Sequence, residues 1–166
     1  MSPRQIFSFP DSVNEVSARL VASGVVIMTS TMLITGWTWM LWPLALGFIA
    51  RVLSGPTLSP LGQFVTRVIT PALGLEERPT PGPPKRFAQG IGATFSVAAL
   101  VSWLVLGSVA GAQVLVSLVL VAASLEAFLG YCLGCKAFGV LMRAGVIPEE
   151  ICLDCADISR RIGTAA

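Results

Sequence analysis

The stretch that decides the fold is "RLVASGVVIMTSTMLITGWTWMLWPLALGFIAR", residues 19–51. Between its two arginines lie 31 residues without a charge. A membrane-spanning helix needs about 20 apolar residues, so the run is long for one span and short for two. Gly36 divides it, and the tryptophans that follow would lie near a membrane–water interface, where indole rings concentrate. We predict two helices, at about 12–34 and 37–53, rather than one long tilted helix.

A second uncharged run, residues 87–125, is interrupted by "GSVAGAQ" at 107–113 and predicts helices at about 87–106 and 113–135. Hydrophobic residues make up 54% of the 166-residue chain and charged residues only 12%, against about 25% charged in soluble domains. The fold class expected is an all-α integral membrane protein, a single membrane domain with four transmembrane helices in two hairpins. The net charge of +2 is too small to indicate nucleic-acid binding.

The basic residues predict the orientation of this membrane domain. The two short turns, around Gly36 and around 107–112, contain no Lys or Arg, and all eleven basic residues fall in the other three segments. The positive-inside rule places those segments, and both termini, in the cytoplasm. Residues 1–18 lack the apolar core of a secretory signal, so we expect the first span to remain in the mature protein.

The middle segment predicts an anchor and a spacer. Ser59 is a candidate N-cap, Pro60 suits the first helical position and Pro71 is the expected stop. Apolar residues recur at the helical period, which predicts a short interfacial helix at about 60–70 on the cytoplasmic membrane surface. Four prolines in "EERPTPGPPKRF" predict a stiff, extended linker over 71–86.

Glu126 is the one acid well inside an apolar run. Ionisable groups at such depth are costly and are usually paired or functional. The predicted topology offers Arg19 and Arg51 as partners in a buried ion pair, and proton handling is the functional alternative. On a straight helix Glu126 would point away from Cys132, unless the helix is kinked at Gly130.

The chain has four cysteines and no histidine, and "CLGCKAFGVLMRAGVIPEEICLDC", residues 132–155, holds all four. They form two Cys-x-x-Cys pairs, Cys132 with Cys135 and Cys152 with Cys155. We expect the first pair at the cytoplasmic mouth of the fourth helix and the second in a helix that begins at Pro148. A helix N-terminus would favour thiolate in the second pair but not in the first.

Three interpretations of the cysteines stay open. The spacing C-x2-C-x16-C-x2-C lies within the range of a four-thiolate zinc site. Two dithiol pairs could instead pass a disulfide or a sulfur atom between them by thiolate attack. The third interpretation is that the thiols only pack as small apolar groups.

Three motifs carry a resemblance to a known family: "RVLSGPTLSPLGQ" (51–63), "PPKRFAQGIG" (83–92) and "EAFLGYCLGCKAF" (126–138). Together they resemble the bacterial domain-of-unknown-function 4395 family of small membrane proteins, over about residues 14–158. The resemblance implies a multi-pass protein of the bacterial plasma membrane, and a rhodanese-like or thioredoxin-like soluble protein as partner, by association only.

We therefore predict a thiol-based component of sulfur or disulfide transfer that uses all four cysteines. The alternative is a structural or accessory subunit of a larger membrane complex, whose cysteines bind one zinc ion. A quinone-coupled thiol oxidase ranks lower from the sequence. Other four-helix proteins of that kind place their cysteine pairs on the outer face, whereas the basic residues here place them inside.

Overall fold

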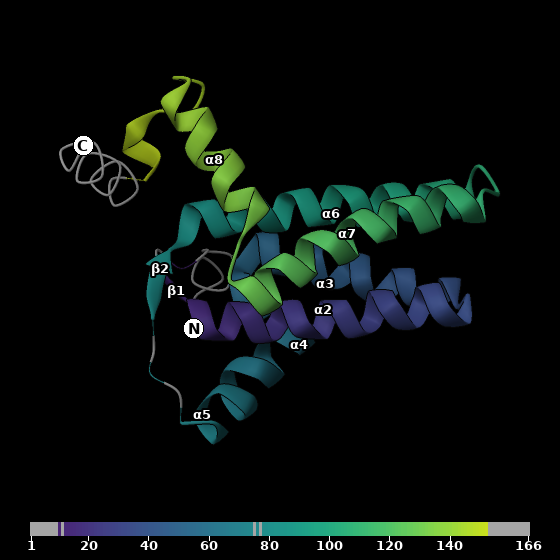
Figure 1. Ribbon diagram of the computed structural model, residues 1–166, viewed down its shortest axis with the longest axis horizontal. Helices are drawn as coiled ribbons and strands as arrows, with labels where there is room; N and C mark the ends of the chain where they lie inside the picture. The colour runs from purple at the N-terminus through teal and green to yellow at the C-terminus, as the bar shows by residue number, and fades with distance from the viewer. Residues whose placement is uncertain (1–9, 11, 75, 77, 153–166) are drawn as a thin grey trace.

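The computed structural model describes residue 10, residues 12–74, residue 76 and residues 78–152. Within this part of the chain four helical segments are long and apolar enough to cross a membrane. They are Glu15–Thr35, Thr38–Ala72, Gly82–Leu104 and Val109–Leu129. The long helices run side by side as one bundle, and both short turns lie at the same end (Figure 1). The predicted class, an all-α membrane protein with four spanning helices, is confirmed.

The first hairpin consists of α2 (Glu15–Thr35) and α3 (Leu41–Ser54), with the 3-10 turn η1 (Thr38–Met40) before α3. Gly36 follows α2 with a φ of 72°, in the left-handed region that glycine adopts without steric cost. Its N–H donates to the carbonyl oxygen of Met32 at 2.9 Å. The chain therefore turns at Gly36, which excludes one long tilted helix.

The second hairpin consists of α6 (Gly82–Leu104) and α7 (Val109–Leu129). Ser108 caps α7, because its hydroxyl oxygen accepts the N–H of Gly111 at 3.1 Å. Helix α6 begins five residues before the predicted position of 87, with prolines in its first turn. Proline is tolerated there because the first N–H groups of a helix have no partner within the helix. The predicted linker over 71–86 is therefore too long.

Two short strands, β1 (Ser12–Asn14) and β2 (Pro79–Pro81), pair antiparallel next to the start of α2. The Asn14 carboxamide oxygen accepts the N–H of Val16 at 3.0 Å and that of Arg78 at 3.3 Å. Helix α2 therefore starts at Glu15, not near Ser12, and the middle segment is tied to its N-terminus.

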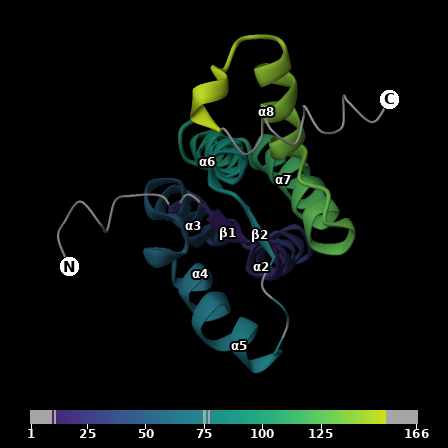
Figure 2. The same ribbon diagram turned by 90° about the vertical axis from the view of Figure 1, so that its left-hand side faces the viewer.

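Between the hairpins lie η2 (Gly55–Thr57), α4 (Pro60–Phe64), the π-helix η3 (Val65–Ile69) and α5 (Thr70–Ala72). The part from α4 to α5 extends away from the bundle (Figure 2). Ser59 caps α4 as expected, accepting the N–H of Gly62 at 3.3 Å. The predicted stop at Pro71 is wrong, because the helical path continues to Ala72. The wider π-turn before Pro71 shifts the backbone hydrogen bonds, so a residue without an N–H can follow.

Helix α2 packs against α7, α3 against α6, and the short α8 (Leu133–Arg143) against the start of α6. Leu41, Ala99 and Val116 are fully buried between the hairpins. Helices α6 and α8 approach closely at Gly134, where an added Cβ would lie 2.5 Å from the Cα of Ala88. This contact fixes α8 across the end of the bundle that carries both strands (Figure 1).

Candidate functional site: a dithiol beside a buried ion pair

The first cysteine pair opens a new helix rather than ending the fourth span. Helix α7 stops at Leu129, because Gly130 adopts a φ of 65° and its N–H bonds back to Glu126. The predicted span to residue 135 is therefore wrong. Cys132 is the N-cap of α8, and its sulfur accepts the backbone N–H of Cys135 at 3.4 Å.

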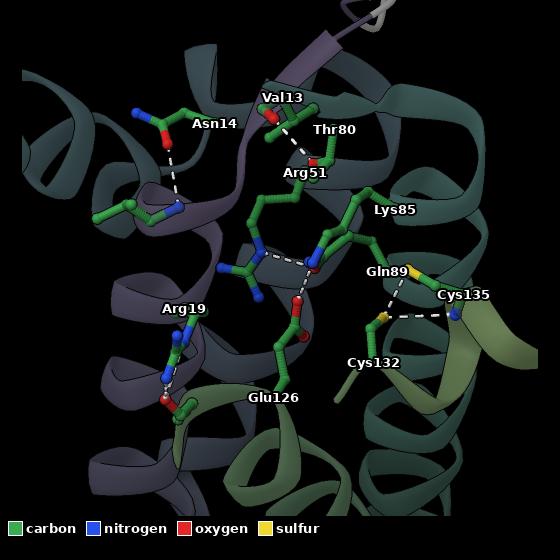
Figure 3. Close-up of polar contacts among 12 residues, drawn as sticks. Val13, Asn14, Arg19, Arg51, Thr80, Lys85, Gln89, Glu126, Cys132 and Cys135 are labelled. Atoms are coloured by element: carbon green, nitrogen blue, oxygen red, sulfur yellow. Dashed lines mark hydrogen bonds and ion pairs between the residues drawn. The ribbon is translucent and has the colours of Figure 1, made fainter. Parts of the chain in front are cut away.

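The two thiols of this pair are in direct contact. The Sγ atoms of Cys132 and Cys135 lie 2.7 Å apart, with the Cys135 thiol as donor (Figure 3). Cys132 is 8% exposed and Cys135 is half-buried. Both are free cysteines, so a small movement would bring their sulfurs to bonding distance.

The environment makes Cys132 the better thiolate. The hydrogen bond from the Cys135 thiol lowers the pKa of Cys132, and the charge of Lys85 and the Cys135 backbone N–H act in the same direction. Burial and the Glu126 carboxylate oppose them. The same shared proton, with burial, raises the pKa of Cys135. The expectation that the first pair gains nothing from a helix N-terminus is wrong, because Cys132 lies at the start of α8.

Glu126 pairs with a residue that the sequence did not indicate. The Lys85 Nζ atom lies 2.6 Å from the Glu126 Oε1 atom, and both side chains are largely buried. Among the described residues, neither Arg19 nor Arg51 forms an ion pair with Glu126. The physical reason is the early start of α6, which places Lys85 on a helix beside α7. Recognising Pro83 and Pro84 as a helix start would have revealed it.

The two predicted arginines have other partners. Arg19 donates from Nε and Nη2 to the carbonyl oxygen of Ala127 at 3.3 and 3.2 Å, and from Nη2 to that of Phe128 at 3.1 Å. It therefore caps the C-terminus of α7, where a cation is favoured.

Arg51 is only 5% exposed. Its Nε donates to the Gln89 carboxamide oxygen at 2.9 Å and its Nη1 to the Ser59 hydroxyl at 3.3 Å. The guanidinium lies 4.5 Å from the centre of the Phe48 ring. Figure 3 shows Arg51, Lys85 and Glu126 gathered at one point of the bundle.

A cavity of about 370 Å³ lies next to this cluster, between α2, α3, α6, α7 and α8. Its polar lining comes from Arg51, Gln89, Glu126 and Cys132, and the rest is apolar or small. Glu126 and Cys132 therefore both line this cavity. The turn at Gly130 redirects the chain between them, which is the effect expected of a kink at Gly130. Sequence reasoning missed Gln89 and Lys85, which come from the first turns of α6.

The second cysteine pair lies at the edge of the described chain. Pro148 precedes only a single 3-10 turn, η4 (Glu149–Ile151), rather than a longer helix. Cys152 follows this turn and is 5% exposed and disulfide-bonded. Cys155 lies outside the described residues. Within the described part of the chain no three His, Cys, Asp or Glu side chains group as metal ligands. Zinc binding by all four cysteines stays a prediction.

The fold and this site define a class: a four-helix membrane protein with a free dithiol at one end of the bundle. The chain belongs to the family described as a domain of unknown function (DUF4395), whose model matches residues 13–143. The resemblance seen in the sequence is confirmed at the level of the family. No curated protein and no solved structure matches the chain.

Proposed function

We propose that the protein is a membrane-embedded thiol component of disulfide or sulfur transfer, in which Cys132 and Cys135 are the reacting pair. The observation that carries the proposal is their geometry. Two free thiols lie 2.7 Å apart at the start of a helix, with one of them favoured as thiolate. Thiolates, not thiols, attack disulfides and sulfur donors.

The unequal exposure of the two sulfurs suggests their roles. Cys135 is the more exposed, so it is the sulfur that a partner thiolate reaches when the pair is oxidised. Attack at Cys135 breaks the S–S bond and releases Cys132 as the thiolate. Because exchange is faster when the leaving thiol has the lower pKa, this division of roles favours reaction. Cys152 and Cys155 would then serve as a second exchange pair.

The proposed partner is a soluble rhodanese-like or thioredoxin-like protein. It would meet the cysteines at the cytoplasmic face of a bacterial plasma membrane, with both chain termini in the cytoplasm. The support for this side is the positive-inside rule: the described Lys and Arg side chains lie away from the two short turns. A rhodanese-like partner would deliver a sulfur atom, and a thioredoxin-like partner would exchange a disulfide with the pair.

The experiment is mass spectrometry of the purified native chain, Cys132→Ser and Cys135→Ser after mild treatment with glutathione disulfide or thiosulfate. We expect an intramolecular disulfide in the native pair. In Cys132→Ser we expect a stable mixed disulfide on Cys135, or a mass gain of one sulfur atom if the protein transfers sulfur. Free thiols alone in all three proteins would contradict the proposal. Preferential modification of Cys132 would reverse the two roles.

A further inference from the structure

We propose that the cavity beside Cys132 binds a membrane quinone, which accepts two electrons from the Cys132–Cys135 dithiol. This inference rests on the proposed exchange function and names its lipid-soluble oxidant. The inference is based on the position of the cavity, which lies among the membrane-spanning helices. Cys132 belongs to the lining of the cavity, and Cys135 does not. A partner protein and a ligand in the cavity would therefore meet different sulfurs.

The walls of the cavity suit an apolar ring that arrives from the bilayer. Phe48, Phe95 and Val25 contribute apolar surface, and the volume of about 370 Å³ lies within the range of ligand pockets, about 300–1,000 Å³. Leu118 and Val121 of α7 also line it, yet they are 50% and 56% exposed. The cavity therefore reaches the outer surface of a spanning helix, where a lipid-soluble ligand could enter.

The polar end suits a neutral ligand with carbonyl oxygens. Arg51 and the Gln89 carboxamide offer hydrogen-bond donors, and Arg51 is held in place by Ser59 and by the face of the Phe48 ring. A donor aimed at an oxygen stabilises the negative charge that develops there on reduction. The lining holds one cation, Arg51, and one carboxylate, Glu126, so its charges balance and a neutral ligand suits it. A quinone meets both conditions, being uncharged before reduction and accepting hydrogen bonds throughout.

The reaction balances with the quinone as oxidant. Both S–H groups lose their protons and a bond forms between the sulfurs of Cys132 and Cys135, which releases two electrons. The quinone takes up the two electrons and two protons and leaves as quinol. A partner dithiol then reduces the new disulfide by attack at Cys135, so electrons pass from partner thiols to the membrane. Because quinones diffuse through the whole bilayer, the step does not depend on which face carries the cysteines.

The test uses the full chain, purified in detergent, reduced, freed of reductant and kept without oxygen. Decylubiquinone is the probe, because its fully substituted ring does not alkylate thiols. Quinol formation is followed by absorbance and remaining thiols by mass spectrometry. We expect one quinol for each Cys132–Cys135 disulfide formed, and no quinol from Cys132→Ser or Cys135→Ser.

A matched pair of variants on α7 tests the cavity. Val121 lines the cavity, whereas Val114 is similarly exposed, at 62% against 56%, and does not. We expect Val121→Trp to slow quinol formation roughly tenfold by obstructing the quinone, and Val114→Trp to leave it unchanged. Equal rates in both variants would overturn the cavity as the site. Thermal stabilisation by decylubiquinone in the native chain but not in Val121→Trp supplies a readout other than turnover.

The outcomes separate this inference from the proposed function. If the pair exchanges with glutathione disulfide but forms no quinol, the quinone inference fails and the exchange function stands. If the pair reacts with neither, both fail. Co-purified phospholipid in the cavity, without quinol formation, would also overturn the quinone.

Discussion

The two ends of the bundle differ in what they bury. The turn end, around Gly36 and Gly107, exposes large apolar side chains, with Trp37 at 53%, Val105 at 74% and Leu106 at 72%. The opposite end buries Arg51 and Lys85 at 5% and 8% exposure. The turn end therefore suits a lipid interface, whereas the opposite end holds charged side chains whose burial costs free energy.

The polar end offsets the free-energy cost of burying charged side chains by giving each of them a bonding partner. A buried charge is tolerated only with partners that replace water. At the polar end Lys85 has Glu126, and Arg51 has Gln89 and Ser59. No described side chain at this site has a fully buried, unbonded N or O atom. An arrangement maintained at such cost beside two free thiols is typical of a functional site.

The largest contrast between the ends should come from Lys85→Met. The variant leaves Glu126 buried without its cation, which should cost about 3–5 kcal/mol of unfolding free energy. At the turn end, Trp39→Leu changes an exposed side chain and should cost no more than about 0.5 kcal/mol. Denaturation of both variants in the same detergent measures the difference.

Lys136→Met is the matched control for the loss of a lysine charge at the polar end, because Lys136 is exposed. It should leave the unfolding free energy nearly unchanged. A similar loss in Lys85→Met and Lys136→Met would show that the ion pair contributes nothing beyond surface charge. The double variant Lys85→Met, Glu126→Gln should recover part of the stability.

A smaller effect is expected where α8 crosses the polar end. An added Cβ at Gly134 would meet the Cα of Ala88 at 2.5 Å, whereas at Gly139 of the same helix it would meet nothing within 4 Å. Gly134→Ala should therefore cost about 1–3 kcal/mol through overpacking. Gly139→Ala should be neutral or slightly stabilising, since alanine favours a helix. Thermal unfolding of both variants checks the order, and a more stable Gly134→Ala would contradict the close packing.

The polar end should also show an unusual pH dependence. Since the pKa of Cys132 is lowered, mainly by the Cys135 thiol, iodoacetamide should alkylate Cys132 at a lower pH than an ordinary thiol. Cys135→Ala removes that donor and should shift the profile toward higher pH. By linkage, the thiolate stabilises the fold above the ordinary thiol pKa, and this contribution is lost as the pH falls through the lowered value.

Peptide mass spectrometry across a pH series gives the alkylation profile of Cys132 in both proteins. A profile that is the same with and without the Cys135 thiol would mean that the contact between the sulfurs does not stabilise the thiolate. The helix N-terminus and Lys85 would then have to account for any remaining shift.

The smallest effect is expected from metal removal. If the cysteines exchange disulfides, elemental analysis should find well below one zinc per chain, and a chelator should leave unfolding and exchange unchanged. One zinc per chain, with a loss of stability on chelation, would favour the alternative of a structural or accessory subunit.

Much of the fold could be predicted from local patterns. The uncharged runs predicted the four spanning helices, and Gly36 predicted the first turn, because both follow from the solvent and from backbone sterics. The start of α6 could not be predicted in this way, because a segment with four prolines also suits an extended linker. A proline pair suits the first turn of a helix equally well, and only the surrounding chain decides between the two.

The sequence by itself determined the class of protein, the cysteine spacing and the presence of one deep acid, since these depend on composition and order. Only the tertiary structure decided the partner of Glu126, the N-cap position of Cys132 and the cavity that both residues line. These features depend on where α6 begins and on the turn at Gly130. Each joins residues far apart in the chain, through helix packing that no local pattern records.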